Sequence, residues 1–296
     1  MKLLIGYDRS PACEKAIADL SEAGLPEKGE AWVVSVQDFY TPPPLPAEML
    51  AGADAISPYF SDIEASRAAV QQELEARAAE GAAKVRAVLP SWTVTAEGLL
   101  EAPSWGLIAR AEELLPDLVV VGAPHGSRLE QVFFGSVCAT VAAKCPVSVR
   151  VGRGRTTPRT HPLRILAAVD GSAYSDAAVS ALAGRRWPGN AEIRLLHVVE
   201  SDWPAFTPES EKIFEEVGRR MLQRYAAQLA PLNHPVDQAV RYGKPRKIVL
   251  EEAAAWDTDV LFVGAKGMSG VERLLLGSVS SAVASRATCS VEIVRS

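Results

Sequence analysis

The sequence contains two copies of one pattern, and this duplication constrains the fold more than any other feature. A short apolar run that ends in aspartate opens each copy, at residues 3–8 (LLIGYD) and 165–170 (ILAAVD). A second run, which starts with aspartate and ends with glycine, follows in the same order at residues 117–122 and 259–264. In both copies twelve residues separate that glycine from a Gly-Ser pair. The chain of 296 residues therefore predicts two similar domains in tandem.

Each copy alternates short apolar runs with helical patterns, which predicts the fold class. In the second copy we expect strands at residues 164–170, 191–199, 236–242, 259–264 and 290–294, and helices near 174–183, 209–229, 245–256 and 278–286. The first copy predicts strands near 2–8, 30–37, 93–97, 117–122 and 147–151. Continuous Val/Ile/Leu runs are typical of parallel strands buried on both faces. The expected architecture is α/β: two doubly wound domains, each a five-stranded parallel sheet with helices on both faces.

Two irregular segments divide this pattern. Gly, Pro and polar residues dominate residues 152–162, so we expect domains at 1–152 and 163–296 with a solvated linker between them. The alternative is that the arginines of the linker steer anions. The second segment, Thr41–Pro46, is rich in proline and cannot be helix interior or central strand. We interpret it as a simple insertion, with a lid or a partner-binding loop as the alternative.

Composition and charge exclude several classes of protein. With 48% apolar and 23% charged residues the chain is ordinary for a globular protein, and its net charge of −5 argues against a broad nucleic-acid surface. No apolar run reaches the length of a membrane helix, and the first one ends at Asp8, too early for a secretory signal. The four cysteines lack metal-site spacing. We therefore expect a cytoplasmic protein with inert thiols, no membrane span and no metal site of its own.

The second copy carries a glycine-rich pattern typical of an anion site. Gly264 ends the fourth expected strand, Gly267 follows in the loop, and Gly277-Ser278-Val279 opens a helix, which gives the spacing G-x2-G-x9-G-S. Glycine lets the backbone approach a ligand closely. A helix that begins near Ser278 offers unpaired N–H groups and the positive end of its dipole, and together these favour phosphate. The alternative is that these glycines only permit tight packing.

A carboxylate completes this constellation. Asp170 ends the first strand of the second copy, and ligands of doubly wound sheets lie at the carboxyl ends of strands. Asp170 and Gly264 face one crevice if their strands are neighbours. The chain has no G-x-x-x-x-G-K-[ST] loop and no G-x-G-x-x-G after the first strand, which excludes the P-loop and disfavours the dinucleotide fold.

Over essentially its whole length the chain resembles the universal stress protein family, through Asp170, Leu196-His197-Val198-Val199 and the glycine spacing. The resemblance implies an adenine-nucleotide α-hydrolase-like fold and ATP binding in the second domain, with or without magnesium. It implies that Asp170 and the backbone of Val198 hold the adenosine end and that Gly264 lies against the ribose. It places the phosphates among four residues, Gly267, Gly277, Ser278 and Val279.

The first copy departs from this pattern. His125 stands where the second copy has Gly267, Pro124 precedes it, and Arg9 stands in place of Gly171. In the second copy the backbone at this position is expected to approach phosphate without a side chain. The side chain of His125 would occupy that space, which predicts weak or absent nucleotide binding in this domain. Alternatively, His125 contacts a phosphate itself.

The residues around the crevice do not predict an enzyme. There is no G-x-S-x-G elbow and no second carboxylate in the motif to position a water. Lys266 could pair with a phosphate, but we expect a solvated loop lysine, and we expect His197 to be half-buried and hydrogen-bonded. We predict no catalytic residues and at most slow ATP hydrolysis. The leading hypothesis is a stress-response protein that uses bound ATP to select its conformation or an unknown protein partner, with an intrachain pseudo-dimer that can pair further into a homodimer. The rivals are an ATP-consuming enzyme on the same fold and a ligand-free interaction module.

Overall fold

The computed structural model describes residues 1–40, 53–123, 134–155, 159–201, 207–267 and 276–296. Its first half contains β1 (Lys2–Gly6), α1 (Pro11–Ala18), the short 3-10 helix η1 (Asp19–Glu22), β2 (Glu30–Gln37), α2 (Ala53–Val88), β3 (Thr93–Leu100), α3 (Pro103–Leu114), β4 (Leu118–Gly122), α4 (Ser136–Lys144) and β5 (Val149–Gly152). Its second half contains β6 (Arg164–Ala168), α5 (Ala173–Ala183), β7 (Glu192–Val199), α6 (Pro208–Leu229), η2 (Ala230–Leu232), β8 (Val236–Tyr242), α7 (Pro245–Ala255), β9 (Val260–Gly264), α8 (Ser278–Arg286) and β10 (Ser290–Val294).

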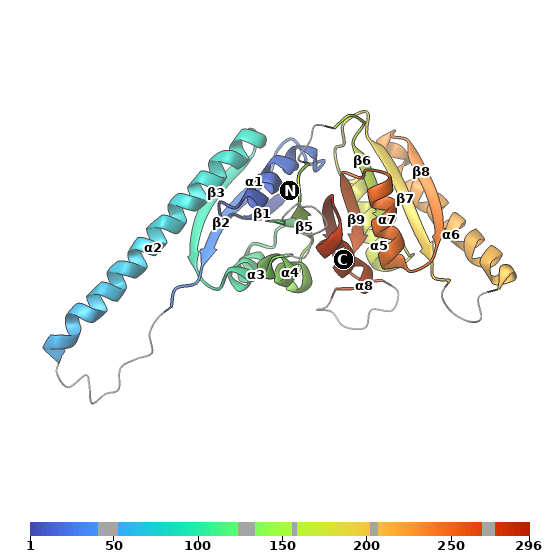
Figure 1. Cartoon of the computed structure of the whole chain (residues 1–296). Coiled ribbons are helices and arrows are strands. Elements are labelled where there is room, and N and C mark those ends of the chain that lie inside the picture. The colour runs from blue at the N-terminus through green and yellow to red at the C-terminus, as the bar shows by residue number, and fades with distance from the viewer. Residues whose placement is uncertain (41–52, 124–133, 156–158, 202–206, 268–275) are drawn as a thin grey trace.

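All these strands belong to one sheet, in the order β3-β2-β1-β4-β5-β10-β9-β6-β7-β8 (Figure 1). Within each half the five strands are parallel, as the apolar runs predicted. The halves meet where β5 and β10 pair antiparallel. The predicted pair of α/β domains is therefore confirmed, and the two sheets are continuous.

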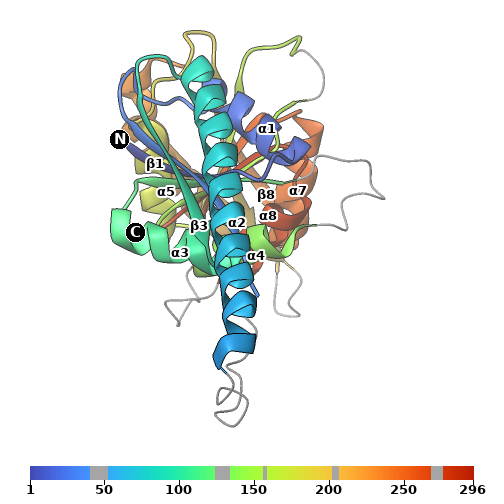
Figure 2. The same ribbon diagram turned by 90° about the vertical axis from the view of Figure 1, so that its left-hand side faces the viewer.

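Helices cover both faces of this sheet. In the first half α1 and α2 pack on one face, and α3 and α4 pack on the other. In the second half α5 and α6 match the first pair, and α7 and α8 match the second. Contact between α4 and α8 joins the halves on that second face, where one hydrophobic core extends across both. Figure 2 shows α2 continuing well beyond the sheet.

In the described part of the linker, Arg153 and Arg155 are not the solvated residues that the composition predicted. Arg153 is only 3% exposed and donates hydrogen bonds to the carbonyl oxygens of Ala284 and Cys289. Arg155 forms ion pairs with Asp257 and Asp259, both at 2.9 Å. The interpretation was wrong because the linker arginines stabilise contacts between the halves. Burial lowers the pKa of the Arg153 guanidinium below its usual value.

Two of the sequence predictions fall on residues that the structure does not describe. The proline-rich Thr41–Pro46 lies outside the described residues, as do Pro124 and His125. Within the part of the chain that is described, no helix combines the length and the hydrophobicity needed to cross a membrane.

Candidate functional site

The candidate crevice lies where the strand order of the second half reverses. β6 pairs with β9 on one side and with β7 on the other, so the connections leave β6 and β9 in opposite directions. In sheets of this kind such a switch point opens a crevice at the carboxyl ends of the strands. Asp170 follows β6 by two residues, and Gly267 follows β9 by three. A Cβ atom added to Gly267 would lie 2.6 Å from Oδ2 of Asp170, so the structure brings these two predicted residues together.

The Asp170 side chain is held by the turn that follows it. Its Oδ1 accepts hydrogen bonds from the backbone N–H of Ser172 (3.0 Å) and from the Ser175 hydroxyl (2.7 Å). Gly171 lies in the left-handed region (φ 87°), which favours glycine. The Ser172 hydroxyl caps α5 by accepting from the backbone N–H of Ser175 at 3.2 Å. These bonds fix Oδ1 and turn Oδ2 toward Gly267.

The N-terminus of α8 lies close to the residues that follow β9, since a Cβ atom on Gly277 would lie 3.3 Å from Cα of Lys266. Gly277 is its N-cap residue and supplies no side-chain cap, unlike Ser172 on α5 and Thr207 on α6. The N–H of Gly277 donates to the carbonyl oxygen of Ala265 at 2.8 Å and is therefore used within the protein. The first helical residues are Ser278 and Val279, whose amides have no partner within the helix. Gly277 itself has no amide left to offer a ligand.

Gly264 has a packing role in this structure. A Cβ atom on it would lie 2.7 Å from Cβ of Tyr174 in α5 and 2.8 Å from the carbonyl carbon of that residue. The equivalent Gly122 meets the backbone of Ala12 in α1 at 2.5 Å. Both halves therefore need glycine here so that the fourth strand can pack against the first helix. This observation supports the packing alternative for Gly264, whatever ligand the crevice takes.

Val198 and His197 lie near the carboxyl end of β7, beside β6. Val198 is half-buried and stands opposite Arg241 of β8 in the strand register. The Nδ1 atom of His197 is 3.0 Å from the carbonyl oxygen of Val169, and its ring packs against Gly218 of α6. The prediction of a half-buried, hydrogen-bonded histidine is confirmed.

Lys266 differs from its prediction. It was expected to be a solvated loop lysine, but only 7% of it is exposed, and its backbone lies close to Gly277. The expectation was wrong because the residues just after β9 pack against the start of α8, where Ala265 accepts hydrogen bonds from Gly277 and Ser280. Ser269, the next polar residue of this segment, lies outside the described part.

The first half has a charged side chain, Arg9, at the position of Gly171. Arg9, in place of Gly171, keeps the left-handed conformation (φ 63°) and pairs with Glu73 (2.5 Å) and Glu80 (2.7 Å) of α2. Burial raises the pKa of Asp8, but hydrogen bonds from Cys13 and Ser10 outweigh it and bring the pKa below its usual value. Asp8 is therefore a carboxylate near neutral pH.

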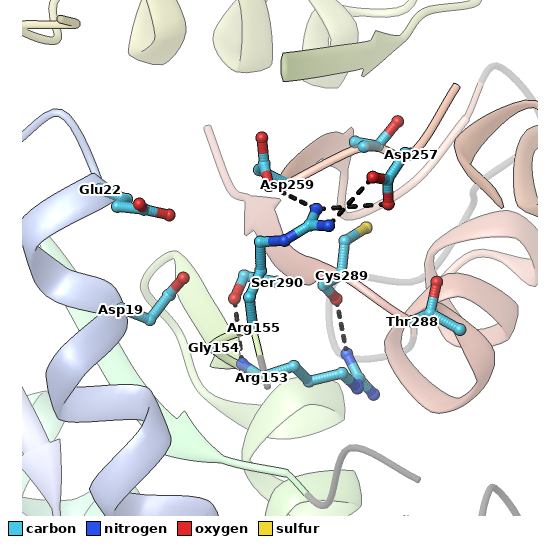
Figure 3. Close-up of a pocket in the computed structure, with 11 residues that line it drawn as sticks. Asp19, Glu22, Arg153, Gly154, Arg155, Asp257, Asp259, Thr288, Cys289 and Ser290 are labelled. Atoms are coloured by element: carbon cyan, nitrogen blue, oxygen red, sulfur yellow. Dashed lines mark hydrogen bonds and ion pairs between the residues drawn. The ribbon is translucent and has the colours of Figure 1, made fainter. Parts of the chain in front are cut away.

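A polar cavity of about 260 Å³, which no sequence motif predicted, lies at the opposite end of β9. Figure 3 shows the side chain of Arg155 directed toward Asp257 and Asp259, and Asp19 and Glu22 on the facing wall. The residues that line this cavity are Asp19, Glu22, Arg153, Gly154, Arg155, Asp257, Thr258, Asp259, Thr288, Cys289 and Ser290. These residues come from segments far apart in the chain, which explains why no local motif marks them.

Comparisons with known proteins agree with this fold. The model of the universal stress protein family matches residues 1–153 and again residues 163–295. A universal stress protein of Thermus aquaticus is 30% identical over 136 residues, which cover 44% of this chain and 97% of that protein. The crystal structure of a universal stress protein from Archaeoglobus fulgidus covers 99% of this chain and 96% of its own, with 19% identity and a TM-score of 0.59. A universal stress protein solved in complex with cAMP covers 46% of this chain and 98% of its own, with 23% identity and a TM-score of 0.32. This chain belongs to the universal stress protein family and contains two of its domains in tandem.

Proposed function

We propose that the second half binds one ATP and that the protein acts as a nucleotide-dependent regulatory or protective module in a stress response. The observation that carries this proposal is that the Asp170 carboxylate lies where a side chain at Gly267 would stand, at the switch point of the sheet. The α8 N-terminus, which has no side-chain cap, stands beside them. We also propose a cytoplasmic location, because all four cysteines are free and a reducing compartment keeps thiols in that state.

Each part of the crevice suits one part of the nucleotide. A carboxylate accepts hydrogen bonds, so Asp170 would receive them from a ribose hydroxyl or a base amine. Amides in the first turn of α8 carry partial positive charge, so Ser278 and Val279 would bind phosphate oxygens. Gly267 and Gly277 would keep side chains out of the path of the phosphates. Gly264 and the backbone of Val198 would border the adenosine end.

Magnesium would reach this site with the phosphates of ATP. Among the residues that the structure describes, no group of three or more His, Cys, Asp and Glu side chains could hold a metal ion. Magnesium prefers oxygen ligands and keeps several waters, so phosphate oxygens and one carboxylate are a suitable set. Its chemistry there would be to neutralise phosphate charge.

The first half is proposed to bind nucleotide weakly or not at all. Arg9 and its ion pairs with α2 stand where the second half has Gly171. We therefore propose a stoichiometry of one nucleotide per chain.

A matched pair of variants tests this assignment. Asp170→Asn keeps an oxygen for Ser172 and Ser175 but removes the carboxylate, whereas Asp8→Asn makes the same change in the first half. Calorimetric titration with ATP and AMP should give one site in the wild type and in Asp8→Asn. In Asp170→Asn affinity should fall by about tenfold or more, the equivalent of about 1.4 kcal/mol. Equal affinity in both variants would move the site away from Asp170.

The enzyme alternative predicts a different result. Turnover of labelled ATP should be slow, because none of the residues proposed for the site has the role of a general base. Rapid hydrolysis that depends on an added substrate would favour an ATP-consuming enzyme. Native mass spectrometry that detects no nucleotide after incubation with ATP would favour a ligand-free module.

A further inference from the structure

The two strands at the junction are related by a pseudo-twofold axis that passes between Arg150 and Glu292. In the antiparallel register Val149 stands opposite Ile293, Arg150 opposite Glu292, and Val151 opposite Val291. In the parallel register of each half, Arg150 pairs with Val120 and Glu292 with Phe262, the same position of the fourth strand. Arg150 and Glu292 are therefore equivalent residues that face each other.

Some contacts at this junction obey the symmetry. The backbone N–H of Arg153 donates to the Ser290 hydroxyl at 3.0 Å, and that of Arg295 donates to the Ser148 hydroxyl at 3.1 Å. The Arg153 guanidinium donates to the carbonyl oxygen of Ala284 in the last turn of α8. The Arg295 guanidinium donates to the carbonyl oxygen of Ala142 in the last turn of α4. Each half thus supplies a cation to the C-terminal, negative end of a helix in the other. Two copies of either half could make these contacts equally well.

The charges on the axis break the symmetry. Arg150 is 0% exposed, and its Nε donates to Asp19 at 2.8 Å while Nη1 lies 3.4 Å from Glu292. Glu292 is 1% exposed and also pairs with Arg185. The result is a buried row of alternating charge: Asp19, Arg150, Glu292 and Arg185. Burial alone would lower the pKa of Arg150, but Asp19 and Glu292 outweigh it and raise the pKa.

This arrangement has a consequence for the choice of partner. Two first halves paired in the same register would place Arg150 opposite Arg150, and two second halves would place Glu292 opposite Glu292. Like charges that meet in a buried site cost several kcal/mol, whereas opposite charges in contact offset part of their desolvation. A specific interface commonly combines attraction to the right partner with repulsion of the wrong one.

We infer that Arg150 and Glu292 make the β5 edge specific for the β10 edge and prevent either half from pairing with a second copy of itself. The symmetric contacts of Arg153 and Arg295 determine which edges meet. The central charge pair determines which half is accepted. The inference concerns the junction alone and does not depend on nucleotide binding.

The test begins with the full chain carrying a protease site inserted between Arg155 and Arg159. The folded protein is cut, unfolded in urea and refolded, and native mass spectrometry separates the three possible pairs by mass. The wild type should return only the pair of first half with second half. The double variant Arg150→Met/Glu292→Met makes the central residues identical and apolar, which is often neutral for stability. It should yield all three pairs in a near-random ratio.

Two further variants keep the test decisive if the double variant refolds poorly. Arg150→Glu places two glutamates on the axis, so the mixed pair should weaken by at least about a hundredfold. Arg220→Glu reverses a charge in an exposed pair with Glu216 on α6 and should leave the pairing unchanged. Pairs of identical halves in the wild type would overturn the inference. A mixed pair that survives Arg150→Glu, or exclusive mixed pairing in the double variant, would do the same.

Discussion

Oδ2 of Asp170 occupies the space that a side chain at Gly267 would need: a Cβ atom on Gly267 would lie 2.6 Å from it. The two residues follow different strands, β6 and β9, and meet only because those strands are neighbours in the sheet. Their proximity places an acceptor of hydrogen bonds beside a stretch of backbone without a side chain. This arrangement is the structural basis for the proposed adenosine and phosphate contacts.

Gly267→Ala should weaken ATP binding by about tenfold or more. The added methyl group would push Asp170 aside, and Asp170 has little freedom because Oδ1 is held by Ser172 and Ser175. Calorimetric titration with ATP measures the change. Gly189→Ala is the matched control, since a Cβ atom there meets no atom within 4 Å and the residue lies on a turn before β7. If both variants bind ATP as the wild type does, the proximity of Asp170 and Gly267 has no part in binding.

Gly264→Ala should destabilise the protein by about 1–3 kcal/mol without any ligand present. Its Cβ atom would lie 2.7 Å from Cβ of Tyr174, so β9 and α5 would have to move apart. Gly122→Ala should cost a similar amount in the first half, where it meets Ala12. Urea denaturation of the nucleotide-free protein measures both changes. A loss of only a few tenths of a kcal/mol would show that the packing at this position is adaptable.

These packing contacts show which parts of the site could be predicted from the sequence and which could not. The duplication and the apolar runs predicted the parallel strands, because both depend on local pattern. The sequence also predicted that Asp170 and Gly264 would lie at the same end of the sheet, since the carboxyl ends of neighbouring parallel strands lie together. The approach of Asp170 to Gly267 was not predicted. The role of Gly264 did not follow, because it depends on the distance between β9 and α5, which no spacing in the sequence reports.

Long-range contacts account for the other differences. Lys266 and Arg153 looked like solvated residues of a loop and a linker, but 7% and 3% of their surfaces are exposed. Each is buried by segments distant in the chain. In the sequence, Arg9 indicated only that the first copy lacks the glycine found at position 171 of the second. In the structure Arg9 pairs with Glu73 and Glu80, about seventy residues away. Such partners become visible only when α2 is placed over the sheet.

The four cysteines should not react with thiol reagents while the protein is folded. All four are free and buried, and burial raises the pKa of Cys289 and Cys13 to about 12 and that of Cys138 to about 11. The thiolate is the reactive form, so reaction near neutral pH should be slow. Iodoacetamide labelling followed by mass spectrometry should find no adducts in the native protein and four after unfolding in guanidinium. Rapid labelling of one native cysteine would reveal local opening around it.

Acid should destabilise the protein through the charge cluster of Arg9, Glu80 and Lys84. Hydrogen bonds from Arg9, then Lys84 and Tyr7, lower the pKa of Glu80 from 4.5 to about 2. A carboxylate with a lowered pKa in the folded state contributes its stabilisation fully above the unfolded value. That contribution is lost as the pH falls from about 4.5 through about 2. Glu80→Gln should therefore flatten this part of the curve of unfolding free energy against pH.

Urea denaturation at a series of acidic pH values measures that curve. The control is Glu251→Gln, which removes a carboxylate from an exposed pair with Lys247 on α7 and should keep the wild-type slope. Because Glu80 is partly exposed, added salt should shrink the difference between wild type and Glu80→Gln. Identical slopes for the two variants would mean that Glu80 titrates alike in the folded and unfolded chains. The pairing of Arg9 with α2 would then contribute nothing to the stability of the first half.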